Sequence, residues 1–194
     1  MAEMKISNFS WRRLLTKTLE NAWSARNERE RIAVVGIGNE FHGDDAAGLL
    51  AVKMLRGELA CTAGRESRAG EVDSPVFRSD KAVLVEAATA PENFTGLLRR
   101  EQPAHILLLD AAWLDSSPGT IAVVNARVAG GMGASTHLQP LATLAGFLER
   151  EIACDVTLVG VQPQNLGFDA PVSPAVRRAC RSLAVFLKGI LTQM

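Results

Sequence analysis

The chain has 194 residues, a length typical of one domain with an appended segment rather than of two full domains. Hydrophobic residues make up 47% and charged residues 22%, which excludes wholesale disorder, and 21 Lys and Arg balance 21 Asp and Glu. We therefore expect neither a nucleic-acid partner nor membrane insertion, because the chain has no net charge and no apolar run near the ~18 residues that cross a bilayer.

The cysteines and the N-terminal region bear on the cellular compartment. Cys61, Cys154 and Cys180 are odd in number and lack CxxC spacing, which is typical of proteins in a reducing compartment. Arg12 and Arg13 superficially match a twin-arginine export signal, but no uninterrupted apolar stretch follows them. We therefore expect a cytoplasmic protein.

Residues 1–30 differ in pattern from the rest and are predicted to form an amphipathic helical extension and a linker. Ser10 can cap a helix whose apolar residues recur with helical spacing from Trp11 to Trp23. This helix is expected to lie on the main domain, and the alternative is a docking helix for a partner protein. The main domain is predicted to span residues 31–194.

From Ile32 onward, short apolar runs alternate with segments of helical periodicity. Strands are predicted at 32–36, 82–85, 106–109, 120–124 and 156–161, and helices at 46–55, 91–100, 138–149 and 173–191. Residues 57–81 are predicted to be a surface excursion. The strand at 120–124 follows its predecessor too closely for a crossover helix, so we expect it to be antiparallel at an edge. The pattern predicts an α/β three-layer sandwich: a mostly parallel five-stranded sheet with helices on both faces.

The segment Gly36-Ile37-Gly38-Asn39 directly follows the first predicted strand and indicates a tight turn. A dinucleotide site is disfavoured because Phe41 occupies the position of the third glycine of that motif and no acidic ribose ligand follows at the usual distance. We expect Gly36, Gly38 and Asn39 to line a cleft.

Asp44 and Asp45 open the next predicted helix, where both carboxylates can gain from the helix dipole. Adjacent residues on a helix do not share a face, so the two side chains cannot act as a pair on one side. The sharper hypothesis divides their roles: Asp44 caps the helix and Asp45 projects into the cleft.

Asp110 and His137 are the remaining candidates. Asp110 ends the third predicted strand, at the sheet edge where open α/β proteins bind ligands, although it could instead cap the next turn. His137 follows a glycine cluster, just before a helix, and a lone histidine is more often structural. Together with Asp45, these two residues form a predicted open site for a first-row transition metal. We expect His42 to face solvent, with a role as a fourth ligand as the alternative, and we assign no role to His105.

These residues and others resemble the maturation endopeptidases of NiFe-hydrogenases, in particular those that process hydrogenase-3-type large subunits. The resemblance extends from Ile32 to the C-terminal helix. Its motifs are Gly36-x-Gly38-Asn39-x4-Asp44-Asp45-x2-Gly48, Ala90-Pro91-Glu92-Asn93, Leu109-Asp110-Ala111, Thr136-His137-x2-Pro140-Leu141, and Gly160-Val161-Gln162-Pro163 with Phe168 and Pro171.

The resemblance implies a hydrolase that removes a C-terminal peptide from the large-subunit precursor of a NiFe-hydrogenase once nickel has been inserted. It also implies that Asp45, Asp110 and His137 are the metal ligands. We expect the same residues to be catalytic, although the sequence does not decide between recognition of the metal alone and recognition with catalysis. The nickel would be supplied by the precursor, so that the isolated protein would not need to hold it.

The chain departs from the family after the second predicted strand, where Glu86-Ala87-Ala88 replaces the usual Asp-Gly-Gly. Because alanine disfavours positive φ, this loop is expected to be stiffer or differently shaped. Two alternatives stay open: a non-cleaving adaptor that binds the nickel-loaded subunit, and another α/β hydrolase such as a peptidyl-tRNA hydrolase.

Overall fold

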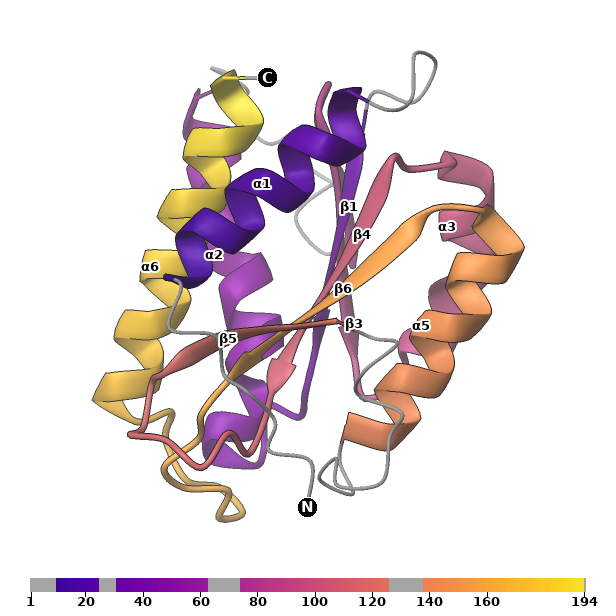
Figure 1. Ribbon diagram of the computed structural model, residues 1–194. Coiled ribbons are helices and arrows are strands. Elements are labelled where there is room, and N and C mark those ends of the chain that lie inside the picture. The colour runs from indigo at the N-terminus through magenta and orange to yellow at the C-terminus, as the bar shows by residue number, and fades with distance from the viewer. Residues whose placement is uncertain (1–9, 25–30, 63–73, 126–137, 194) are drawn as a thin grey trace.

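The computed structural model describes residues 10–24, 31–62, 74–125 and 138–193. A six-stranded sheet lies between two layers of helices (Figure 1). Its strands are β1 (Ile32–Ile37), β2 (Val76–Arg78), β3 (Ala82–Ala88), β4 (His105–Ala111), β5 (Ile121–Asn125) and β6 (Asp155–Val161). The helices are α1 (Trp11–Ser24), α2 (Ala47–Thr62), α3 (Thr95–Glu101), α5 (Leu138–Ile152) and α6 (Pro174–Gln193), with 3-10 helices η1 (Gly43–Ala46) and η2 (Pro91–Phe94). The predicted α/β three-layer architecture is confirmed.

The sheet is parallel at its centre and antiparallel at both edges. The strand order is β2-β3-β1-β4-β6-β5, and β3, β1, β4 and β6 run parallel to their neighbours. β5 pairs antiparallel with β6 at one edge, as predicted for residues 120–124. Since parallel strands end at the same side of the sheet, the last residues of the neighbouring strands β1 and β4 lie at the same sheet edge.

Residues 57–81 contain more regular structure than predicted. Helix α2 continues to Thr62, beyond the point where Gly57 interrupts the apolar pattern, and β2 pairs antiparallel with β3 at the second edge of the sheet. The surface-excursion prediction is wrong for these two segments, and the sheet has one strand more than expected. β2 has only three residues, none of them fully buried, so it lacks the apolar run that marks the central strands.

Alternate residues of the central strands point into two separate apolar cores. Val34 and Leu107 belong to the core beneath α1, α2 and α6, whereas Val35 and Leu108 belong to the core beneath α3 and α5 (Figure 1). β1 is buried along its whole length, as expected for a strand covered on both faces.

Helix α1 packs against the main domain. Leu15 and Leu19 are fully buried in the core beneath α2 and α6, and Trp11 contacts Phe186 of α6 edge to face at 5.0 Å between ring centroids. The backbone oxygen of Ser10 accepts hydrogen bonds at the start of the helix, where the sequence places a cap. The division of the chain at residue 31 stays a prediction. No helix in the parts of the chain that the structure describes is long and apolar enough to span a bilayer.

Two glycines let the start of α2 approach the sheet at backbone distance. A Cβ atom on Gly48 would lie 2.0 Å from the backbone oxygen of Leu109, and one on Gly36 would lie 2.6 Å from that of Gly48. No side chain fits at either position, so the N-terminal turn of α2 lies directly on the ends of β1 and β4.

The substitution Gly48→Ala is expected to lower the free energy of unfolding by roughly 2–4 kcal/mol, because the new methyl group displaces backbone that cannot yield cheaply. Gly57→Ala in the same helix is the matched control, since a Cβ there meets nothing within 4 Å. That control should gain about 0.5–1 kcal/mol from helix propensity. Denaturant unfolding of both variants measures the contrast, and equal effects would contradict the close approach.

Candidate functional site

The turn after β1 and the short helix η1 form one hydrogen-bonded unit. The backbone N–H of Asn39 donates to Oδ2 of Asp45 at 2.9 Å. Gly38 has φ +136°, and a Cβ atom there would lie 1.9 Å from the backbone oxygen of Asp45. The turn therefore requires glycine, and it fixes the Asp45 carboxylate beside the end of β1. A cleft-lining role for Gly36, Gly38 and Asn39 stays a prediction.

Asp44 is fully buried, with 0% of its surface exposed, and it binds the loop between β6 and α6. Its carboxylate accepts backbone hydrogen bonds from Gln164, Asn165 and Ser173, at 2.8, 2.9 and 2.6 Å. The predicted helix-capping role is therefore wrong, because the donors come from a segment about 120 residues away in sequence rather than from the following turn. Asp44 joins η1 to the β6–α6 loop.

The hydrogen bonds decide the ionisation of Asp44. Burial on its own raises the pKa of this carboxyl, but the backbone donors of Ser173, Asn165 and Gln164 outweigh it, so the pKa lies below its ordinary value of 3.8. Asp44 is thus a structural anion at neutral pH.

Asp110 lies in β4, one residue from its end, and is the counterpart of Asp45 across the site. Burial raises the pKa of Asp110 from 3.8 to about 7, a backbone hydrogen bond at Ala111 opposes this, and the negative charge of Asp45 adds to it. Two of the three predicted site residues therefore lie close enough for their charges to interact. They reach this place because α2 begins directly on the end of β4.

The histidines have different surroundings. His137, the third predicted ligand, lies outside the described residues, and within the part of the chain that the structure describes no three His, Cys, Asp or Glu side chains form a group able to hold a metal. His42 is half-buried rather than facing solvent: its Nδ1 lies 3.4 Å from the Leu166 oxygen and its ring contacts Phe168. His105 is buried at the start of β4, with Nε2 2.9 Å from the Thr157 hydroxyl.

The segment Glu86-Ala87-Ala88 forms the end of β3, and its last residue has a left-handed backbone conformation. Ala88 adopts φ +49°, and its backbone oxygen accepts a hydrogen bond from the Gly38 N–H at 2.9 Å. Ala88 thus adopts the left-handed geometry that alanine disfavours, at a cost of about 1–2 kcal/mol, and the expectation of a stiffer or differently shaped loop stays a prediction. The bond to Gly38 is a contact that holds it there.

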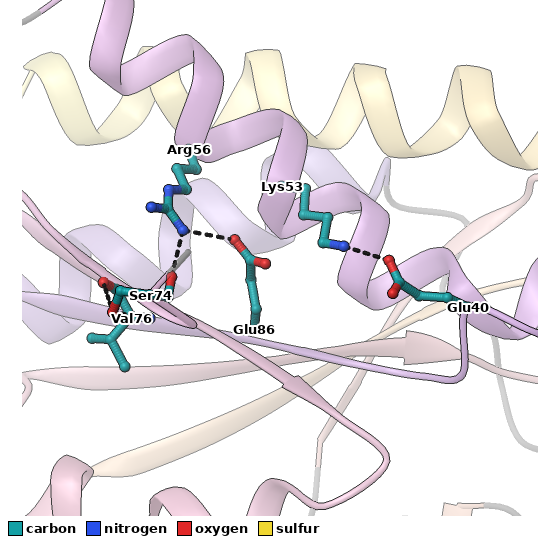
Figure 2. Close-up of polar contacts among 6 residues, drawn as sticks. All are labelled: Glu40, Lys53, Arg56, Ser74, Val76 and Glu86. Atoms are coloured by element: carbon teal, nitrogen blue, oxygen red, sulfur yellow. Dashed lines mark hydrogen bonds and ion pairs between the residues drawn. The ribbon is translucent and has the colours of Figure 1, made fainter. Parts of the chain in front are cut away.

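Helix α2 presents two basic side chains that sequence reasoning missed (Figure 2). Arg56 Nη1 lies 3.1 Å from Glu86 Oε1 and 2.7 Å from the Ser74 oxygen, while Lys53 pairs with Glu40. Lys53 and Arg56 are three residues apart and therefore share one helix face, and this spacing is the sequence feature that could have identified them. Arg56 lay beyond the predicted helix end at residue 55. Because Glu40 and Glu86 are paired, they do not add unpaired negative charge to that of Asp45 and Asp110.

The buried thiol nearest the site is chemically inert. Burial and then the charge of Asp44 raise the pKa of Cys180 to about 12, and its Sγ donates to the Ala47 oxygen at 3.3 Å. A thiol with this pKa stays protonated at neutral pH, so it cannot serve as a nucleophile.

Comparison with known proteins decides the family. The family model described as hydrogenase maturation protease matches residues 74–188. The chain belongs to the hydrogenase maturation protease family. It is therefore a hydrolase of the peptidase class. The matched residues include Asp110 and the position of His137, and they begin after Asp45.

Individual relatives agree with this assignment. A protein of Methanocaldococcus jannaschii named as a hydrogenase maturation protease is 28% identical over 165 residues, 85% of this chain and 90% of the relative. The hydrogenase 3 maturation protease of Escherichia coli K12 is 28% identical over 155 residues, 79% of this chain and 86% of the relative. A crystal structure of a hydrogenase maturation protease from Thermococcus kodakarensis shares the fold, with a TM-score of 0.70 at 24% identity over 90% of this chain and 99% of that one.

Asp44→Asn is expected to destabilise the protein at pH 7 by roughly 2–4 kcal/mol, because three backbone donors lose a charged acceptor. The folded pKa of Asp44 is depressed, so its stabilisation is present above about pH 4 and is lost as the pH falls through the folded value. Unfolding measured from pH 7 down to pH 2.5 should show the two proteins converging in acid. A difference that does not shrink there would contradict the anionic role.

The substitution Asp110→Asn is expected to raise the free energy of unfolding at neutral and alkaline pH, whereas Asp44→Asn lowers it. The folded pKa of Asp110 is raised, so the native state binds more protons than the unfolded state between about pH 4 and 7, and wild-type stability falls as the pH rises through that range. In metal-free buffer the variant should exceed the wild type in stability by on the order of 4 kcal/mol at pH 8 and match it near pH 4. A difference in unfolding free energy that is the same at every pH would show that Asp110 is not desolvated.

Proposed function

We propose that this protease removes a C-terminal peptide from the large-subunit precursor of a NiFe-hydrogenase and that it recognises the nickel carried by that substrate. Family membership supports the hydrolytic reaction and the hydrogenase substrate. The finer statement is supported by one feature: the negative charge of Asp45 acts on Asp110 and adds to the effect of burial in raising its pKa.

Two carboxylates in one partly buried place repel each other unless a cation lies between them. Carboxylate oxygens, with the imidazole of His137 as a third donor, suit a first-row divalent metal such as nickel. The nickel is part of the substrate and would arrive bound to the precursor. Docking of a loaded precursor then relieves the repulsion, whereas docking of an empty precursor does not.

This difference makes the site a checkpoint, because specificity is a difference between two binding free energies. Asp45 is suited to the task since the Asn39 N–H and the Gly38 turn hold its carboxylate in place before the substrate arrives. Asp110 is held by the rigid end of a central strand. Either carboxylate can also act as the general base that activates water for attack on the scissile carbonyl.

The reducing compartment expected from the cysteines suits such a substrate. Cys61, Cys154 and Cys180 form no disulfide. The proposed site of the reaction is therefore the cytoplasm, where thiols stay reduced.

The test is cleavage of a nickel-loaded large-subunit precursor, followed by intact mass spectrometry. Asp45→Ala, Asp110→Ala and His137→Ala should each lower the cleavage rate by roughly two orders of magnitude or more. Glu40→Gln is the matched control, because Glu40 is an exposed carboxylate of the same loop that pairs with Lys53. Its rate should stay within about two-fold of the wild type.

The outcomes separate the alternatives. Cleavage that survives all three alanine substitutions would refute the site, and equal cleavage of nickel-free precursor would refute the checkpoint. A stable complex with the loaded precursor and no mass change would favour the adaptor, and release of tRNA from peptidyl-tRNA would favour the other hydrolase.

A further inference from the structure

A second concave site lies where the beginning of α1 meets α6. The cavity has a volume of about 510 Å³. Its lining comes from both helices: Arg12, Arg178, Arg181, Ser182, Val185 and Phe186. None of these residues takes part in the proposed proteolytic site.

The charge around this cavity is strongly one-sided. Helices α1 and α6 together carry seven Lys and Arg residues against one Glu, although the whole chain is neutral. Lys188 pairs with Glu58 at 3.0 Å, but among the described residues no carboxylate forms an ion pair with Arg12, Arg178 or Arg181. Three like charges that line one cavity repel one another, so an anionic occupant would be favoured.

The cavity also has preformed apolar surface. Val185 leaves 51% of its surface exposed, and Phe186 is held edge to face by Trp11. The Arg12 guanidinium lies 4.3 Å from the centre of the Trp11 ring and donates to the Ser182 hydroxyl at 2.6 Å. Arg12 is therefore positioned by stacking while most of its N–H groups stay available.

These features define the chemistry of the occupant. Guanidinium groups bind carboxylates in a planar, two-point geometry, and an apolar wall binds an aliphatic or aromatic side chain. A short acidic peptide segment with one large apolar residue supplies both.

We propose that the cavity between α1 and α6 is a docking site for an acidic segment of a partner protein. The carboxylates of that segment pair with Arg12, Arg178 and Arg181, and its apolar side chain packs on Val185 and Phe186. The proposal is independent of the proteolytic site and does not need the partner to be the substrate.

A displayed library of random twelve-residue peptides, selected on the full chain, tests this directly. Recovered sequences should carry several Asp or Glu residues beside one large apolar residue. Their affinity, measured by fluorescence anisotropy, should fall at least ten-fold for the double variant R178E/R181E. Replacing the apolar residue of a recovered peptide by Ser should weaken binding several-fold.

The control variant is R100E/R150E, which makes the same change in net charge at exposed arginines of α3 and α5, on the other face of the sheet. It should bind within about two-fold of the wild type. Equal loss in both variants, or recovered peptides without acidic residues, would overturn the proposal. The proposal would also be overturned if no peptide is recovered and another anion binds instead. That result would be binding of phosphatidylglycerol vesicles or of a single-stranded oligonucleotide that depends on Arg178 and Arg181.

Discussion

The backbone contact between the start of α2 and the ends of β1 and β4 is the constraint on which the site depends. Gly36, Gly38 and Gly48 remove the side chains that would hold these segments apart, and each approaches backbone at a distance that no Cβ atom permits. Asp45 on η1 is thereby placed beside Asp110 on β4. The glycines thus act as spacers that set where two carboxylates meet, and the chemistry of those carboxylates follows from this placement.

Asp44 and Asp110 differ in the direction in which their surroundings shift the pKa. Asp44 turns away from Asp45 toward the β6–α6 loop, where backbone donors compensate its burial and keep it ionised. Asp110 has burial without equivalent donors and carries the added repulsion of Asp45. One aspartate stabilises the fold as an anion, and the other reduces its stability when ionised. A site that gives up stability at Asp110 is suited to a positively charged ligand.

The parts predictable from sequence were those that local pattern encodes. Apolar runs located the central strands, and a short connection identified the antiparallel edge strand β5. The roles of Asp44 and Ala88 were not predictable, because the first depends on donors about 120 residues away and the second on a single hydrogen bond from Gly38. Strand β2 was not predicted because its three residues, none of them fully buried, are too few to show an apolar pattern typical of a strand. His137 lies outside the described residues, so its place in the site stays a prediction.

Net charge did not predict the local distribution of charge, because a sum over the chain does not show where the charged residues lie. A balance of 21 basic and 21 acidic residues excludes a global attraction to anions, but it does not exclude a local one. Here α1 and α6 are basic, while Asp45 and Asp110 lie on elements that contact each other, η1 and β4. Within a Debye length of about 8 Å at physiological salt, a partner responds to the nearest charges rather than to the total. One neutral chain can therefore be proposed to carry both a cation-binding site and an anion-binding cavity.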